Sequence, residues 1–230
     1  MSKIAIMGAM PEEIAPLLKK VENIKCVEYA NNRYYEATYK GRELVIAYSK
    51  IGKVFSSLTA STLIEKFSCD TLLFSGVAGA INPELKIGDL IIADKLSQHD
   101  LDISIFGHPF GYVPEGSVFV ESDERLRAIA KEVAQKRGLK LIEGTIATGD
   151  QFVASNERKA FILEHFQADA LEMEGASVAV VCDALDVPFF ILRAISDTAN
   201  DDAGIDFDAF MVESASISAN FILDMVENIE

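Results

Sequence analysis

Acidic side chains, an arginine and several glycines stand directly after four apolar runs of the sequence. The four stretches are MPEE (10–13), SGVAG (75–79), LEMEG (171–175) and RAISD (193–197), and a further turn is TGDQFV (148–153). Ligands of α/β sheets bind outside the carboxyl ends of the strands, so we expect these stretches to meet in one cleft. Because burial and neighbouring carboxylates both raise the pKa of a carboxyl group, such a cleft is suited to holding a proton.

Taken singly, each stretch also has a structural interpretation. Glu12 and Glu13 would favour the positive start of a helix, an interaction worth ~0.3–1 kcal/mol. Asp197 could cap a helix, and Glu174 could form an ion pair with Arg193. The combination favours a functional cleft, because burying each charge costs several kcal/mol unless a partner or a purpose compensates.

The cleft must be held by strands that alternate with helices. Apolar runs predict strands at 3–7, 71–77, 89–93, 140–147, 168–172 and 189–196, with an antiparallel stretch at 33–48. Spacing and end signals predict helices from Pro11, over 52–67, 123–137, 156–166 and 175–185, and from Asp206 onward. This alternation predicts an α/β fold over residues 1–230, a single-domain three-layer α/β/α sandwich with a central mixed β-sheet.

The composition argues against several kinds of partner. The 230 residues include 36 acidic and 21 basic side chains, a formal net charge of −15. Nucleic acids and anionic membrane surfaces need a basic face, so neither is expected as a partner. The apolar runs are too short to span a bilayer and no signal-peptide pattern is present, which predicts a cytoplasmic protein. The three cysteines lack metal-site spacing, so no metal is expected. No cofactor is expected either.

Eight longer segments carry a family pattern from residue 4 to residue 210. They are IAIMGAMPEE, SKIGKV, FSGVAGAI, QHDLDISIFG, ATGDQFV, LEMEGASVAVVC, VPFFILRAISD and FDAF. In this order they resemble the methylthioadenosine/S-adenosylhomocysteine nucleosidase family of the nucleoside phosphorylase superfamily. The resemblance implies a phosphorylase-like fold, a homodimer and irreversible hydrolysis of an N-ribosidic bond with release of adenine. The implied substrates are 5′-methylthioadenosine and S-adenosylhomocysteine, with 5′-deoxyadenosine and 6-amino-6-deoxyfutalosine as further candidates.

The catalytic roles that the resemblance implies fall on the stretches named above. Asp197 would protonate N7 of adenine, and Glu13, beside Arg193, would hold and deprotonate the attacking water. Glu174 would bind the ribose hydroxyls, with Met173 packed against the sugar. Acid or base assistance of this kind is typically worth about 10²–10⁴-fold in rate.

The other implied contacts surround the base and the 5′ substituent. Phe152 would stack on adenine, the Val153 backbone would bond the edge of the base, and Ser196 would support Asp197. The expected set is completed by Glu172, Ala78 and Gly79, by Met10, Ile51 and Phe207 at the 5′ group, and by Ile103, Phe106 and Pro114 of the partner subunit. The commoner family pattern has Ser where Val77 stands, and some relatives have Tyr where His108 stands.

Two other functions stay open from the sequence. A purine nucleoside phosphorylase would need a phosphate site beside the ribose, but no Arg cluster follows the strands and Glu13 would repel phosphate. A nucleoside sensor without turnover would need neither an acid nor a base for water. The apolar stretch 103–119 is either a loop folded on its own core or a subunit contact, because monomers rarely expose such patches.

Overall fold

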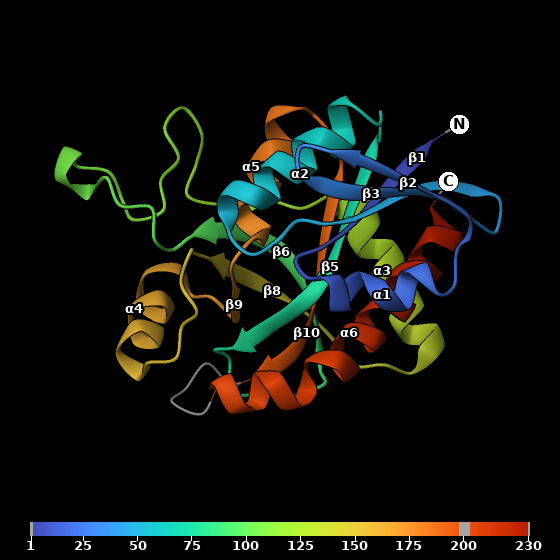
Figure 1. The fold of residues 1–230 in the computed structure, drawn as a ribbon. Coiled ribbons are helices and arrows are strands. Elements are labelled where there is room, and N and C mark those ends of the chain that lie inside the picture. The colour runs from blue at the N-terminus through green and yellow to red at the C-terminus, as the bar shows by residue number, and fades with distance from the viewer. Residues whose placement is uncertain (1, 198–202, 230) are drawn as a thin grey trace.

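The central element of the fold is one mixed β-sheet of ten strands (Figure 1). The structure is a computed structural model that describes residues 2–197 and 203–229. The strands are β1 (Lys3–Gly8), β2 (Glu22–Tyr29), β3 (Asn32–Tyr39), β4 (Arg42–Tyr48), β5 (Thr71–Ala80), β6 (Leu90–Gln98), β7 (Val120–Glu121), β8 (Leu141–Thr148), β9 (Ala170–Glu172) and β10 (Phe189–Asp197). The helices are α1 (Pro11–Leu18), α2 (Lys53–Glu65), α3 (Glu124–Arg137), α4 (Asn156–Phe166), α5 (Gly175–Ala184) and α6 (Ala203–Asn228), with a 3-10 turn η1 (Ser104–Phe106). Side chains are described for residues 2–197 and 210–229.

Half of the sheet closes on itself, which the sequence did not indicate. β10 pairs with both β5 and β6, and the path β6–β8–β9–β5 completes a ring of five strands. β1, β4, β3 and β2 continue outward from β5 as an open sheet. The ring matters for the site because it brings β9 and β10 to the same strand, β5.

Helices cover both faces of the sheet, so the predicted three-layer α/β arrangement is confirmed. On one face α1 and α3 pack against α6, which itself lies on β5 and β10. On the other face α2 packs against α5, which lies on β6 and β8 (Figure 1). The described residues form three cores of buried apolar side chains, and the two larger ones fill the spaces between these layers.

Local sequence signals explain where the best-defined helices start and stop. α1 begins with Pro11 at its first position, and the Glu13 side chain turns back to accept a hydrogen bond from the Met10 N–H. α3 begins after Asp123, whose carboxylate accepts a hydrogen bond from the Leu126 N–H. It ends at Gly138, which has a φ of 64°.

The element boundaries show what the sequence missed. β2 was not predicted, because its side chains are almost all exposed and show no alternation of apolar and polar residues. β5 runs on through Gly76 and Gly79 to Ala80, and β6 runs on to Gln98, both past their predicted ends. α6 begins at Ala203, earlier than the predicted Asp206. The extensions of β5 and β6 carry residues of the site and its surroundings.

A long segment without regular strands, residues 101–119, projects from the body of the molecule (Figure 1, green). Its tip carries Ile105 and Phe106, which are 89% and 78% exposed. Gly111, with φ of +76°, has no room for a Cβ against the Phe166 ring, so this part of the segment is held closely to α4. The segment is therefore anchored at Gly111 while its tip stays exposed.

Within the two ranges that the structure describes, no helix has both the length and the apolar character needed to cross a membrane.

Candidate active site

The candidate site is a pocket beside strands that run in opposite directions. β1, β5 and β10 run parallel to one another, whereas β9 runs antiparallel to β5, with Gly79 opposite Leu171. The pocket is lined by Ala9, Met10, Glu13, Ile51, Val77, Ala78, Gly79, Gln151, Phe152, Val153, Leu171, Glu172, Met173, Glu174, Ser196 and Asp197. The five stretches singled out in the sequence therefore do meet in one cleft.

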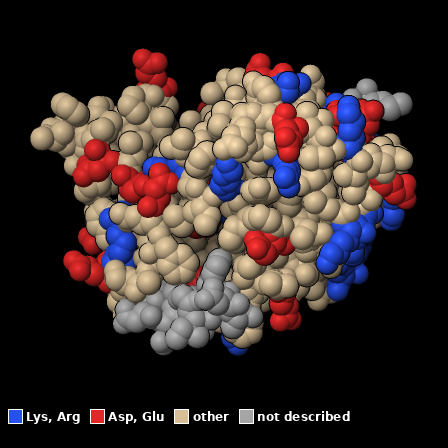
Figure 2. All heavy atoms as spheres, viewed as in Figure 1, with Lys and Arg blue, Asp and Glu red and all other residues tan. Residues whose placement is uncertain are grey.

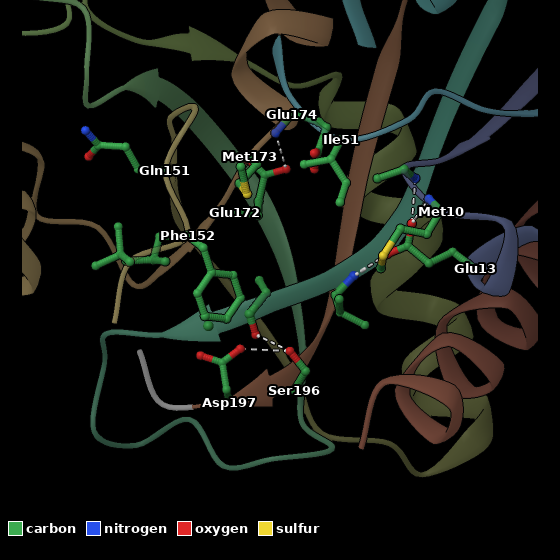
Figure 3. A pocket seen from close by; sticks show the side chains of 16 residues that line it. Met10, Glu13, Ile51, Gln151, Phe152, Glu172, Met173, Glu174, Ser196 and Asp197 are labelled. Atoms are coloured by element: carbon green, nitrogen blue, oxygen red, sulfur yellow. Dashed lines mark hydrogen bonds between the residues drawn. The ribbon is translucent and has the colours of Figure 1, made fainter. Parts of the chain in front are cut away.

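The pocket has two chemically different ends. Figure 3 shows Phe152 and Asp197 at one end, and Met10 and Glu13 at the other. Met173 and Glu174 belong to the wall supplied by β9 and the start of α5. A ligand in this pocket would meet an aromatic face and a carboxyl group at one end and a second carboxyl group at the other.

Not every predicted residue lies on this lining. Arg193 is buried behind the wall, where it contacts Glu172. Ile103, Phe106 and Pro114 do not line the pocket of their own chain, and their assignment to a partner subunit stays a prediction. The side chain of Phe207 lies outside the described residues.

The lining also includes Ala9, Val77, Gln151 and Leu171, which were not predicted as site residues. Gln151 and Leu171 stand inside the stretches TGDQFV and LEMEG, and Ala9 directly precedes MPEE. The stretches were therefore correct, but the sequence could not show which of their side chains face the cavity.

Glu13 is held in place almost entirely by backbone amides. Its Oε2 accepts from the N–H groups of Ala9 (2.5 Å) and Met10 (3.0 Å), and its Oε1 accepts from the N–H of Val77 (3.1 Å). A Cβ at position 76 would come within 2.8 Å of Oε1, so Gly76 makes room for this carboxylate. Burial raises the pKa of Glu13, while the nearby Arg193 and the three amides act in the opposite direction.

Arg193 is a fully buried cation whose partner is Glu172. Its Nη2 donates to Glu172 Oε2 at 2.7 Å, and its Nη1 donates to the carbonyl oxygens of Leu192 (3.0 Å) and Phe74 (3.3 Å). The guanidinium also stands 4.1 Å from the centre of the Phe74 ring. The possible pairing of Arg193 with Glu174 is therefore wrong, because the hydrogen-bonded ion pair is made with Glu172.

Glu172 has both carboxylate oxygens occupied by protein donors. Oε2 accepts from the N–H groups of Glu174 (3.1 Å) and Gly175 (2.7 Å) as well as from Arg193, and Oε1 accepts from the Thr148 hydroxyl. These bonds fix the start of α5 and leave little acceptor capacity for a ligand. Glu172 lies on the pocket wall, but its hydrogen bonds go to neighbouring protein groups and hold them in position.

Glu174 is the least satisfied carboxyl group of the three glutamates. Its Oε1 accepts from the Gly52 N–H at 2.8 Å, and the residue is 6% exposed. Burial first, and then the negative charge of Glu172, raises the pKa of Glu174 to about 8. Near neutral pH this carboxyl group is therefore mostly protonated, so it can donate as well as accept a hydrogen bond.

The opposite end of the pocket combines an acid with an aromatic face. Asp197 is 4% exposed, and the hydroxyl of Ser196 lies 3.0 Å from Asp197 Oδ2 (Figure 3). Phe152 is 51% exposed, whereas its neighbour Val153 is buried. A flat apolar ligand could lie on the Phe152 ring with a polar atom directed at Asp197.

Known proteins with the same architecture identify the family. A family model described as the phosphorylase superfamily matches residues 3–227. The chain belongs to the phosphorylase superfamily. This superfamily member is similar to the aminodeoxyfutalosine nucleosidase of Campylobacter jejuni, with 59% identity covering 100% of both chains. It is also similar to the 5′-methylthioadenosine/S-adenosylhomocysteine nucleosidase of Shewanella sediminis, with 37% identity over 99% of this chain and 100% of that one.

A solved structure agrees with this assignment. The Helicobacter pylori 5′-methylthioadenosine/S-adenosylhomocysteine nucleosidase with butyl-thio-DADMe-Immucillin-A superposes with a TM-score of 0.98. The two chains are 47% identical, and the match covers 100% of this chain and 99% of that one. Within the phosphorylase superfamily, the chain therefore belongs with the nucleosidases.

The raised pKa of Glu174 predicts a specific pH dependence of stability in this nucleosidase. A carboxyl group whose folded pKa exceeds its usual value stabilises the fold fully below the unfolded pKa, and the stabilisation is lost as pH rises. For Glu174 the window runs from 4.5 to about 8. Within this pH range, ionisation of Glu174 should lower the free energy of unfolding by at most about 1.4 kcal/mol per pH unit. Urea unfolding of Glu174→Gln should show a shallower decline than the unaltered protein. The exposed Glu12→Gln should keep the original slope, and equal slopes in all three proteins would contradict the assignment.

Proposed function

We propose that this protein hydrolyses the N-ribosidic bond of adenine nucleosides that carry a 5′ substituent, and so releases adenine. The observation that carries the proposal is the charge of the pocket lining. It contains four carboxyl side chains, Glu13, Glu172, Glu174 and Asp197, and no Lys or Arg among the described residues. A phosphate dianion would meet no cationic side chain on this described lining and would be repelled by the Glu13 carboxylate, whereas a water molecule can be bound and deprotonated there.

At the base end, Asp197 acts as the general acid. Cleavage of the bond leaves negative charge on adenine, and a proton delivered to N7 neutralises it. The short distance to Ser196 holds the Asp197 carboxyl in one orientation. Phe152 provides a stacking surface, which for a nucleobase is worth about 1–3 kcal/mol in single-strand-binding proteins.

At the sugar end, Glu13 acts as the base for water. A carboxylate offers about four lone-pair positions, and backbone amides of Ala9, Met10 and Val77 occupy three of them. The remaining position, on Oε1, can accept a hydrogen bond from water. Because the three amides fix the carboxylate, the water would be held in one place for attack on the anomeric carbon.

Glu174 binds the ribose hydroxyls, and Met173 packs against the sugar. One Glu174 oxygen is already tied to Gly52, so the other is available to a hydroxyl group of the ligand. Positive charge that develops on the sugar is stabilised by the negative end of the site, where the Glu13 carboxylate lies.

The 5′ substituent lies against the apolar side chains of Met10 and Ile51. An apolar wall accepts the methylthio group of 5′-methylthioadenosine, and it also accepts S-adenosylhomocysteine, 5′-deoxyadenosine and 6-amino-6-deoxyfutalosine. The 59% identity with the Campylobacter jejuni aminodeoxyfutalosine nucleosidase supports the last of these as a physiological substrate. With that substrate the enzyme would serve the alternative route to menaquinone.

Measurement of adenine release tests the proposed hydrolysis and the role of Asp197. Asp197→Asn should lower kcat by about 10²–10⁴-fold, because the amide cannot deliver a proton, while adenine binding measured by calorimetry is retained. Asp183→Asn, an exposed change on the far end of α5, should leave kcat unchanged. Release should proceed without phosphate. A phosphate requirement with formation of ribose-1-phosphate would show a phosphorylase instead, and full turnover by Asp197→Asn would remove this residue from its role.

We further propose that two copies of the chain form a homodimer in which Ile103, Phe106 and Pro114 of one copy complete the 5′ pocket of the other. Phe106 is 78% exposed, and in Figure 2 the projecting segment at the left is covered mainly by uncharged atoms. On α2, beside the pocket residue Ile51, Val54 is 76% exposed. Burial of these apolar side chains against a second copy would account for both exposed surfaces.

The dimer is tested by sedimentation at micromolar concentration. The expected species has twice the chain mass, and Phe106→Ser should raise the KM for nucleosides with long 5′ groups more than the KM for adenosine. A monomer at this concentration would contradict the proposal. The cytoplasmic location stays a prediction.

A further inference from the structure

A second cluster of charged side chains, of which Lys53 and Asp100 are half-buried, lies outside the pocket lining, between α2 and the chain that follows β6. Lys53 Nζ lies 2.6 Å from Asp100 Oδ1, and the two side chains are only 18% and 16% exposed. Neither residue lines the pocket. Exposed ion pairs on protein surfaces contribute little, so a pair this well covered needs an explanation in its neighbours.

The other oxygen of Asp100 reaches a third segment. Asp100 Oδ2 accepts from the Asp150 N–H at 2.8 Å, and Asp150 Oδ1 accepts from the Lys53 N–H, also at 2.8 Å. Asp100, Lys53 and Asp150 therefore form a closed set of three bonds, which we term the clamp. It joins the end of β6, the start of α2 and the turn after β8.

Two of these three segments carry walls of the pocket. On one side of the clamp, Gly52 donates its N–H to Glu174 Oε1, and Ile51 lines the pocket. On the other side, residues 151–153 follow Asp150 and line the pocket around Phe152. The contact between the sides is close, because a Cβ at Gly52, where φ is +98°, would come within 2.9 Å of Asp150 Oδ1.

The turn 149–153 also packs against a buried histidine, His99. Arg158 of α4 donates to the His99 carbonyl oxygen at 2.8 Å and contacts His99 Nδ1 at 2.9 Å. The His99 ring packs so closely on Gly149 that no Cβ could fit there. The Gly149 N–H also donates to the Glu172 carbonyl oxygen at 3.2 Å, so the start of the turn 149–153 is fixed, and the contact with Asp100 holds the residue that follows it.

We propose that Asp100 is a positioning residue that sets the width of the nucleoside pocket by holding the turn 149–153 against the start of α2. The inference rests on the proposed function, since it concerns the pocket that takes the nucleoside. Asp100 touches no pocket atom itself and acts through Asp150 and Lys53. Without it, only the bond from the Lys53 N–H to the Asp150 carboxylate would remain of the clamp, so the separation between Phe152 and the Gly52 amide that orients Glu174 would be held less tightly.

The chemistry of the clamp requires a carboxylate at position 100. Burial acts to raise the pKa of Asp100, but hydrogen bonds from Lys53 and the Asp150 amide outweigh it, so the net pKa is lowered. The ionised group accepts at both oxygens. An asparagine has one acceptor oxygen and one NH2 group, so it can satisfy either Lys53 or the Asp150 amide, but not both.

The experiment measures kcat and KM for release of adenine from 5′-methylthioadenosine by Asp100→Asn. Loss of a charge-assisted hydrogen bond should raise KM by about tenfold, while kcat falls less than threefold because Glu13 and Asp197 are untouched. Lys53→Met should raise KM similarly. The double variant should be no worse than the more impaired single variant, because both changes open the same clamp.

Two controls separate positioning from general destabilisation. Asp102→Asn changes an exposed carboxylate two residues along, which accepts a hydrogen bond from the Ser104 N–H. Arg127→Met breaks a comparably covered ion pair with Glu143, between α3 and β8 and away from the pocket. Arg127→Met should lower the melting temperature at least as much as Asp100→Asn does, yet leave KM unchanged, as should Asp102→Asn.

The outcomes distinguish the two proposals. An unchanged KM in Asp100→Asn, with active unaltered protein, would overturn the positioning role and leave the hydrolase intact. A KM that rises equally in Arg127→Met would also overturn it, because the effect would then follow from stability alone. No adenine release by the unaltered protein would overturn the proposed function, and the positioning role with it.

Discussion

The arrangement of the site depends on one buried cation. Arg193 has almost no exposed surface, and it is hydrogen bonded to Glu172, to two backbone carbonyls and packed on the Phe74 ring. Removing one member of a buried ion pair costs about 3–5 kcal/mol, because the other charge is left uncompensated. The pocket can hold several carboxyl groups close together only because this positive charge stands behind its wall and lowers the cost of ionising those nearest to it.

The three glutamates of the site differ because their donors differ. Glu172 has bonds at both oxygens and serves the wall, whereas Glu13 has three amide donors and one free acceptor position. Glu174 is buried, lies beside the charge of Glu172 and has a single amide donor, so its pKa is raised and it retains its proton near neutral pH. Under the proposed function, the same residue type would therefore support the structure, activate water or bind a hydroxyl group according to how many protein donors reach it.

Much of the fold and of the candidate site could be predicted from the sequence, and the features that could not be predicted have physical reasons. The apolar strands and the caps of α3 depend on local signals, so their positions followed from residue type. β2 lacks such a signal because it is exposed on both faces. The pairing of Arg193 with Glu172 rather than Glu174 could not be predicted, because two candidate acids stand two residues apart and only the ring of strands decides which faces the guanidinium. The clamp joins residues about 50 and 100 positions apart, and no local pattern indicates such long-range contacts.

The central claim is that Arg193 pairs with Glu172, while burial and the negative charge of Glu172 leave Glu174 with a proton. It is tested most directly by carbon-13 NMR of protein labelled at the glutamate carboxyl carbons, titrated from acid to alkaline pH. The account predicts one glutamate that titrates at about 8, with a signal that disappears in Glu174→Gln. If the only glutamate signal that disappears in Glu174→Gln titrates near the usual value of about 4.3, the account is contradicted.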